Sequence, residues 1–271
     1  MSHVRLGAVG YLNARPLVFG LEGSSRFDLR FDVPSRCATL LHEHGIDVGL
    51  IPSIDYLRGP GPYSIVPGPA VTSRGPVASV ALYTRKEPRD IRTIAMDTSS
   101  RTSIALTTVL VNRVYRIAPD TLAMPPDLDA MLARADAGLI IGDHALLLDH
   151  GAAGARKIDL GALWTDTTGL PFVYAFWAGW PGVLSSPDVR ALQQARDDGV
   201  AHTDEIARTY FEDRVDLQAV ASRYLRDNVQ YFLGPEELEG LRAFYGYAAE
   251  CGLVIFDGQM RFYDAEHSGS R

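Results

Sequence analysis

The chain has 271 residues, of which 46% are hydrophobic and 22% charged, so one large domain or two lobes of about 100–150 residues each can bury a core. Its 26 Lys and Arg against 33 Asp and Glu give a formal net charge of −7, which excludes the basic face of a non-specific nucleic-acid-binding protein but allows a small anionic ligand. The cysteines Cys37 and Cys251 form no CxxC pair, so neither a disulfide framework nor a zinc knuckle is indicated.

No apolar run approaches the about 18–20 residues of a membrane span. A signal peptide is not visible either, because Asn13, Arg15 and Pro16 interrupt the apolar residues near the start of the chain. We therefore expect a cytoplasmic protein with no membrane partner. Nothing in the sequence fixes an oligomeric state.

Short apolar runs alternate along the chain with longer periodic segments, which is typical of βα units and a largely parallel sheet. The expected strands are 4–9, 27–33, 46–52, 63–68, 77–85, 91–97, 137–143 and 170–180. The expected helices are 14–21, 34–44, 104–115, 144–150, 186–211, 216–233 and 234–253. Residues 265–271 are expected to form a frayed tail.

Two of these strands, 77–85 and 170–180, are candidates for crossing between lobes. The expected fold is therefore α/β with two lobes, in which residues 1–82 and 178–271 form one lobe and residues 83–177 the other. In such folds the ligand binds in the cleft at the carboxyl ends of the strands.

Polar residues follow several of these strands. Asn13 comes after the first strand, where it could cap the next helix or contact a ligand. The segment "MDTSSRTS" (96–103) begins a helix, whose free N–H groups favour an anion; Ser99, Ser100, Arg101 and Thr102 could hold a carboxylate there. The alternative for this segment is simple helix capping.

Three further residues are candidates for the cleft. Asp143 in "IIGDHAL" and Ser53 in "IPSID" each end a strand, and each could be a helix cap instead. Ser79 lies in a strand and has no capping role, so it either packs as a small residue or faces the cleft.

Several familiar sites are absent from the sequence. There is no GxGxxG after the first strand, no GxxxxGK[ST] and no GxSxG, so nucleotide loops and the hydrolase elbow are not indicated. His42 and His44 are two residues apart and do not share a helix face, which argues against a metal site. We therefore expect no metal site.

In order along the chain, "GAVGYLNARPL", "DVGLIPSIDYL", "GPVASVAL", "DTSSRTS", "IIGDHAL" and "LGALWTDTTGLPFVYAFWA" resemble segments of the chorismate dehydratases of the futalosine route to menaquinone. The resemblance covers about residues 4–180. It implies a type-II periplasmic-binding-protein fold and the loss of water from chorismate to give 3-[(1-carboxyvinyl)oxy]benzoate, without metal or organic cofactor. By motif, Asn13 and Ser79 match the family's functional polar residues, and Ser99–Thr102 match its carboxylate-holding helix start.

The identity of the base that removes the C3 proton stays open. One hypothesis is that the substrate's own enolpyruvyl carboxylate takes the proton while Asn13 and Ser79 orient groups on the ring. The rival hypothesis is that Asp143 or His144 is the base. The alternatives for the whole protein are a non-catalytic solute-binding protein for a small carboxylate, the related 1,4-dihydroxy-6-naphthoate synthase and a ligand-sensing regulatory domain.

Overall fold

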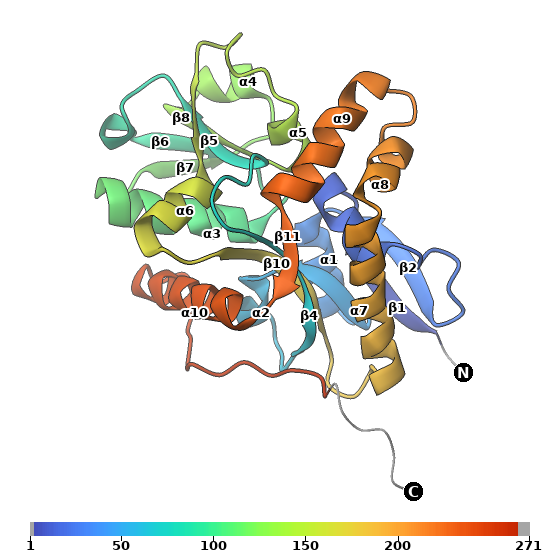
Figure 1. Ribbon diagram of the computed structural model, residues 1–271. Helices are drawn as coiled ribbons and strands as arrows, with labels where there is room; N and C mark the ends of the chain where they lie inside the picture. The colour runs from blue at the N-terminus through green and yellow to red at the C-terminus, as the bar shows by residue number, and fades with distance from the viewer. Residues whose placement is uncertain (1–2, 265–271) are drawn as a thin grey trace, which may run out of the picture.

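The computed structural model describes residues 3–264. These residues form two β-sheets flanked by helices (Figure 1). The first sheet has the order β11-β4-β10-β3-β1-β2 and the second has the order β7-β6-β8-β5-β9. Two α/β sheets agree with the two-lobe architecture expected from the alternating pattern. The expected tail at residues 265–271 lies outside the described residues.

The strands of the first sheet are β1 (Val4–Val9), β2 (Phe27–Asp32), β3 (Val48–Pro52), β4 (Ser64–Ser73), β10 (Phe172–Gly179) and β11 (Gln230–Leu233). Those of the second are β5 (Val80–Thr84), β6 (Thr93–Met96), β7 (Asp120–Ala123), β8 (Ala137–Ile141) and β9 (Arg156–Asp159). Both sheets are mixed rather than largely parallel. Strand β1 pairs in parallel with β2 and β3, whereas β10 runs antiparallel to β3 and β4.

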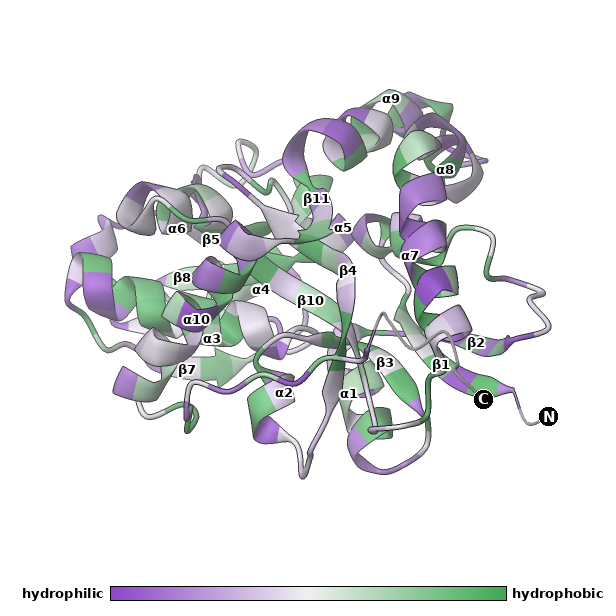
Figure 2. Cartoon of the chain, turned by 60° about the horizontal axis from the view of Figure 1, so that its bottom comes forward, coloured by the Kyte–Doolittle hydropathy of each residue, from purple (hydrophilic) through white to green (hydrophobic). Residues whose placement is uncertain are grey.

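The helices and helical turns are η1 (Leu12–Val18), α1 (Pro34–His42), α2 (Asp55–Arg58), η2 (Pro88–Asp90), α3 (Arg101–Leu110), η3 (Val111–Tyr115), α4 (Leu128–Leu132), α5 (Gly142–Leu146), α6 (Leu160–Thr168), α7 (Ser186–Ala201), α8 (Thr203–Tyr210), α9 (Val215–Arg223), η4 (Tyr224–Asn228) and α10 (Pro235–Glu250). They flank the sheets, and the hydrophobic residues gather on the strands between them (Figure 2). Every residue of β3, β5, β8 and β10 is buried, which explains why these strands are almost continuously apolar in sequence. Within residues 3–264, no helix has the length and hydropathy needed to cross a membrane.

Neither of the two strands that were expected to cross between the lobes does so. The chain passes from one sheet to the other in segments outside these strands. Strand β5 pairs only within the second sheet, and β10 pairs along its length with β3 and β4 of the first. Strand pairing thus divides the chain at 74–79 and at 160–171, whereas the sequence predicted boundaries after residues 82 and 177. The difference arises because the apolar pattern reports burial and does not identify the sheet that a strand joins.

The sequence predicted a helix over 216–233, and this prediction is wrong for the second half of the segment. Helix α9 ends at Arg223, and after the π-helical turn η4 the chain forms the edge strand β11. Tyr231 and Leu233 are buried, whereas Gln230 and Phe232 between them are exposed. This alternation has the period of a strand, and the apolar residues of the preceding helix hid it.

Candidate active site

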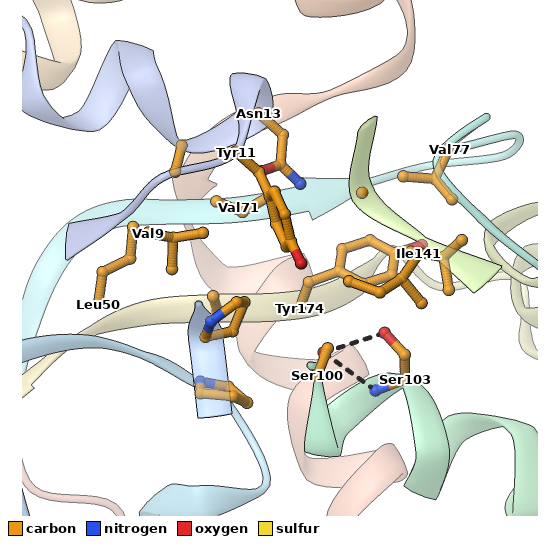
Figure 3. A pocket seen from close by; sticks show the side chains of 16 residues that line it. Val9, Tyr11, Asn13, Leu50, Val71, Val77, Ser100, Ser103, Ile141 and Tyr174 are labelled. Carbon is orange, nitrogen blue, oxygen red and sulfur yellow. Dashed lines mark hydrogen bonds between the residues drawn. The ribbon is translucent and has the colours of Figure 1, made fainter. Parts of the chain in front are cut away.

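A cavity that is partly open to solvent lies between the two sheets. Side chains from both sheets form its walls: Val9, Leu50 and Val71 from the first, and Val80 and Ile141 from the second. Tyr11 and Asn13 enter from one side, and Ser100 and Ser103 face them from the start of α3 (Figure 3). The cavity is thus mostly apolar and has a few polar groups at opposite ends, as small-molecule sites usually do.

Asn13 lines the cavity and is not a helix cap. The residue at the cap position of η1 is Tyr11, and no side-chain cap bond is made there. The Asn13 side chain instead forms part of the cavity wall, near the phenol of Tyr224. Of the two roles that the sequence left open for Asn13, capping is therefore not the one seen.

Ser79 lies just behind the cavity wall, between the lining residues Val77 and Val80. It is 1% exposed, and its Oγ accepts a hydrogen bond of 2.6 Å from the Tyr224 hydroxyl. Its carbonyl accepts a bond of 2.8 Å from the N–H of Gly142. Ser79 is therefore more than a small packing residue, because its side chain and its backbone both hold neighbouring segments.

The backbone that presents Ser79 is held in an unusual conformation. Ala78 has a φ of 65°, in the left-handed region that costs a residue with a Cβ about 1 kcal/mol or more. The Asp159 carboxylate accepts the N–H of Val77 at 3.0 Å and that of Ala78 at 2.7 Å. Lys157 Nζ donates to the Ala78 carbonyl at 2.6 Å. These three bonds fix the turn and with it the position of Ser79.

The start of α3 forms the opposite end of the cavity. Ser100 is the N-cap residue, and its Oγ accepts the Ser103 N–H at 3.4 Å and the Ser103 hydroxyl at 3.1 Å. The first N–H groups of a helix have no intrahelical acceptor and carry the positive end of its dipole. An anionic group in the cavity would meet this end of the helix.

Three other predicted site residues bond to protein groups instead. Ser99 donates its N–H and its hydroxyl to Asp97 Oδ1, at 2.9 and 2.6 Å. Thr102 Oγ1 accepts the N–H of Ile54 at 3.1 Å and lies 3.3 Å from Ser53 Oγ. The Ser53 hydroxyl donates to the carbonyl of Val173 at 2.8 Å. Ser53, Ser99 and Thr102 are thus absent from the cavity lining.

Arg101 also points away from the cavity. Its guanidinium donates to Asp55 at 3.3 Å and to Thr39 Oγ1 at 3.0 Å. Asp55 is 1% exposed, and burial raises the pKa of its carboxyl, while the charge of Arg101 opposes that rise. The ion pair therefore joins α3, beside the second sheet, to α1 and α2, beside the first.

Asp143 makes a second connection between the two halves. One carboxylate oxygen accepts the N–H of Leu12 at 3.2 Å, and the other accepts the hydroxyl of Tyr210. Burial raises the pKa of this carboxyl. Asp143 does not line the cavity, although the preceding Gly142 does, and His144 is exposed. Asp143 therefore lies between η1 and α8 rather than against a ligand.

Tyrosines also form part of this site. Tyr11 and Tyr174 line the cavity, and the hydroxyl of Tyr224 donates to Ser79 beside it. The sequence did not single out Tyr11 or Tyr224 as a site residue. A Cβ on Gly142, whose φ is +63°, would lie 3.0 Å from the Tyr11 ring, so this glycine allows the ring to lie against it. The "YLN" motif could have drawn attention to Tyr11. Nothing near Tyr224 in the sequence sets it apart.

The described residues, 3–264, contain no group of three or more His, Cys, Asp or Glu side chains that could hold a metal ion.

A family model described as menaquinone biosynthesis matches residues 4–250 of this sequence. The chain belongs to this family. A relative, the chorismate dehydratase of Thermus thermophilus, is 28% identical over 261 residues, which cover 88% of this chain and 93% of that protein.

Solved structures resemble this menaquinone-biosynthesis family member in fold. A protein from Archaeoglobus fulgidus superposes with a TM-score of 0.76 at 16% identity, covering 93% of this chain and 98% of its own. The alkanesulfonate-binding protein of Xanthomonas axonopodis pv. citri, bound to MOPS, gives 0.68 at 16% identity, covering 94% and 95%. The fold is therefore the two-lobe periplasmic-binding-protein-like fold that the resemblance implied.

Proposed function

We propose that this protein is a chorismate dehydratase, a hydro-lyase that removes water from chorismate in menaquinone biosynthesis. The family match and the name of the Thermus relative support the pathway and the substrate. The observation that carries the proposal is the arrangement of the cavity: Asn13 and the Ser79 turn lie on one side and the start of α3 on the other. Chorismate, a ring with two carboxylates, matches this pairing of apolar walls with an anion-favouring end.

In this proposal the ring carboxylate binds at Ser100, Ser103 and the first N–H groups of α3. The C3 proton is conjugated with that carboxylate through a ring double bond, so hydrogen bonds to the carboxylate stabilise the charge that develops as the proton leaves. The C4 hydroxyl departs as water with the proton that the base has taken from C3, and the ring becomes aromatic. Ser53, Ser99, Arg101 and Thr102 then support the helix start from behind.

The substrate's enolpyruvyl carboxylate acts as the base in this proposal, while Asn13 and Ser79 orient groups on the ring. Asp143 is the less suitable base because Leu12 and Tyr210 occupy both of its oxygens. His144 is exposed. Enclosure between the lobes keeps water from the reacting ring. The enzyme acts in the cytoplasm and takes a small molecule as its partner.

The test is to incubate the purified protein with chorismate and to follow the products by mass. The expected product has lost one water and absorbs as an aromatic enol ether. Binding of chorismate without turnover would indicate a solute-binding protein of the same fold. Turnover of a cyclic futalosine product instead would indicate the naphthoate synthase, and neither binding nor turnover of chorismate would overturn the proposal.

A further inference from the structure

Tyr224 lies beside the two residues that the proposed function places at the reacting ring. It is the first residue of η4, far along the chain from both, and is 2% exposed. Its hydroxyl donates to Ser79 Oγ at 2.6 Å, and the Asn13 side chain lies near the same phenol. One buried hydroxyl therefore joins η4 to the turn that begins the second sheet.

The direction of this bond determines what Ser79 can do. A phenol has one proton, and the proton of Tyr224 is directed at Ser79 Oγ. The proton of Ser79 itself has no acceptor among the bonds formed within residues 3–264. A hydroxyl that accepts one hydrogen bond donates a stronger one, because neighbouring bonds polarise each other.

We propose that Tyr224 is a positioning residue for this reaction: by donating to Ser79 it turns the Ser79 proton towards the substrate, where it bonds the oxygen of the departing hydroxyl. The inference rests on the proposed function. In this inference Ser79 donates a hydrogen bond to the substrate, and Tyr224 orients the Ser79 hydroxyl so that it can do so.

The phenol keeps its own proton throughout. Burial raises the pKa of Tyr224 well above its usual value, and the bond to Ser79 only partly opposes this rise. A group with so high a pKa is a poor acid at neutral pH. Tyr224 therefore acts through Ser79 and does not supply the proton that leaves with the water.

The turn that carries Tyr224 is attached to the Ser79 loop at a second point. Asn228, at the end of η4, donates through Nδ2 to the Pro76 carbonyl at 3.0 Å. The five residues of η4 form a π-helical turn, a rare conformation that often occurs at functional sites. The two contacts, Tyr224 to Ser79 and Asn228 to Pro76, fix the orientation of the turn relative to the loop.

The test is to replace Tyr224 by Phe and to measure the kinetics of chorismate turnover. We expect kcat to fall about tenfold, which corresponds to about 1.4 kcal/mol, or one hydrogen bond. KM should change less than about twofold, because the bond acts on the departing group rather than on binding. In a Ser79→Ala background, Tyr224→Phe should lower kcat no further, since the group it orients is gone.

Tyr231→Phe is the matched control. Tyr231 is also a buried tyrosine, and its hydroxyl has no hydrogen-bond partner within residues 3–264. Removing it is the same chemical change without an effect on Ser79, so kcat should stay within about twofold of the wild type. Thermal unfolding of every variant is recorded alongside the kinetics.

An active wild type with an unchanged kcat in Tyr224→Phe would overturn this inference alone. So would an equal fall in kcat in the wild-type and Ser79→Ala backgrounds, which indicates a general structural effect. A wild type without chorismate turnover would overturn the proposed function and this inference with it. If Tyr224→Phe does not fold, Asn228→Ala serves instead: a fall of about threefold in kcat is expected, and an unchanged kcat would contradict the inference.

Discussion

The start of α3 and the Asn13–Tyr224–Ser79 group lie at the same cavity but use their polar side chains differently. At α3, Arg101 and Thr102 bond to residues beside the first sheet, and only the hydroxyls of Ser100 and Ser103 face the cavity. In the other group, side chains from three distant parts of the chain come together, and Tyr224 donates to Ser79. The comparison teaches that the densest polar motif in this sequence mainly holds the two halves together, while the proposed function assigns the chemistry to scattered residues.

Asn13→Ala is the strongest way to test the functional side of this comparison. We expect chorismate turnover to fall by about 100-fold or more, the usual loss when a donor near developing charge is removed. The free energy of unfolding should fall by no more than about 1 kcal/mol, because Asn13 caps no helix. Turnover kinetics and urea unfolding measure the two effects. A large loss of stability with little loss of turnover would make Asn13 a structural residue.

Arg101→Ala should lower the free energy of unfolding strongly and chorismate turnover only moderately. It leaves the buried Asp55 carboxylate without its charged partner, and breaking such a pair typically costs 3 kcal/mol or more. Because the Arg101 side chain is 34% exposed, we expect about 2–3 kcal/mol in urea unfolding and a loss of turnover below about tenfold.

The control for Arg101 is Arg214→Ala. Arg214 pairs with Asp216 at 2.8 Å, but both side chains are more than half exposed, so the free energy of unfolding should change little. If Arg101→Ala abolished turnover and left stability unchanged, Arg101 would be a substrate ligand, as the sequence predicted.

Of these substitutions, Asp143→Asn should change the free energy of unfolding least, and the change should depend on pH. Burial raises the pKa of Asp143 above its ordinary value of 3.8, so the folded protein still holds this proton at a pH where the unfolded chain has released it. The stability contributed by the protonated group is therefore lost as pH rises from about 4 through the raised pKa. Asparagine does not titrate.

The free energy of unfolding of Asp143→Asn relative to the wild type should accordingly increase between about pH 4 and pH 7. Urea unfolding of both proteins at several pH values measures this difference. The buried Asp55 carboxyl also titrates with a raised pKa, but it is common to both proteins and cancels. A difference that is constant with pH would contradict the assignment.

Much of the fold could be predicted because the buried strands are apolar for their whole length. Strands β3, β8 and β10 appear in the sequence as runs of this kind, and the structure confirms them. Strand β7 could not be recognised, since Asp120–Ala123 is mostly exposed and has no hydrophobic pattern. Strand β11 was hidden by the helix before it.

The candidate site was predictable only where a motif marks it. Asn13 and Ser100 follow strands, where polar residues draw attention, and both line the cavity. Tyr224 reaches Ser79 through tertiary packing of the C-terminal segment, and no local pattern encodes such a contact. Similarly, the sequence could not reveal that Arg101 turns towards Asp55, because a buried aspartate can be recognised only after the chain has folded.

The left-handed conformation of Ala78 also limits how this position can vary by mutation. Single-base changes of an alanine codon lead to Val, Thr and Pro among others, and a φ of 65° suits none of these three. Glycine and aspartate, which the same codons can also reach, tolerate that conformation well. Few single-base substitutions at residue 78 are thus compatible with the backbone conformation, although its own side chain contributes nothing more than a methyl group.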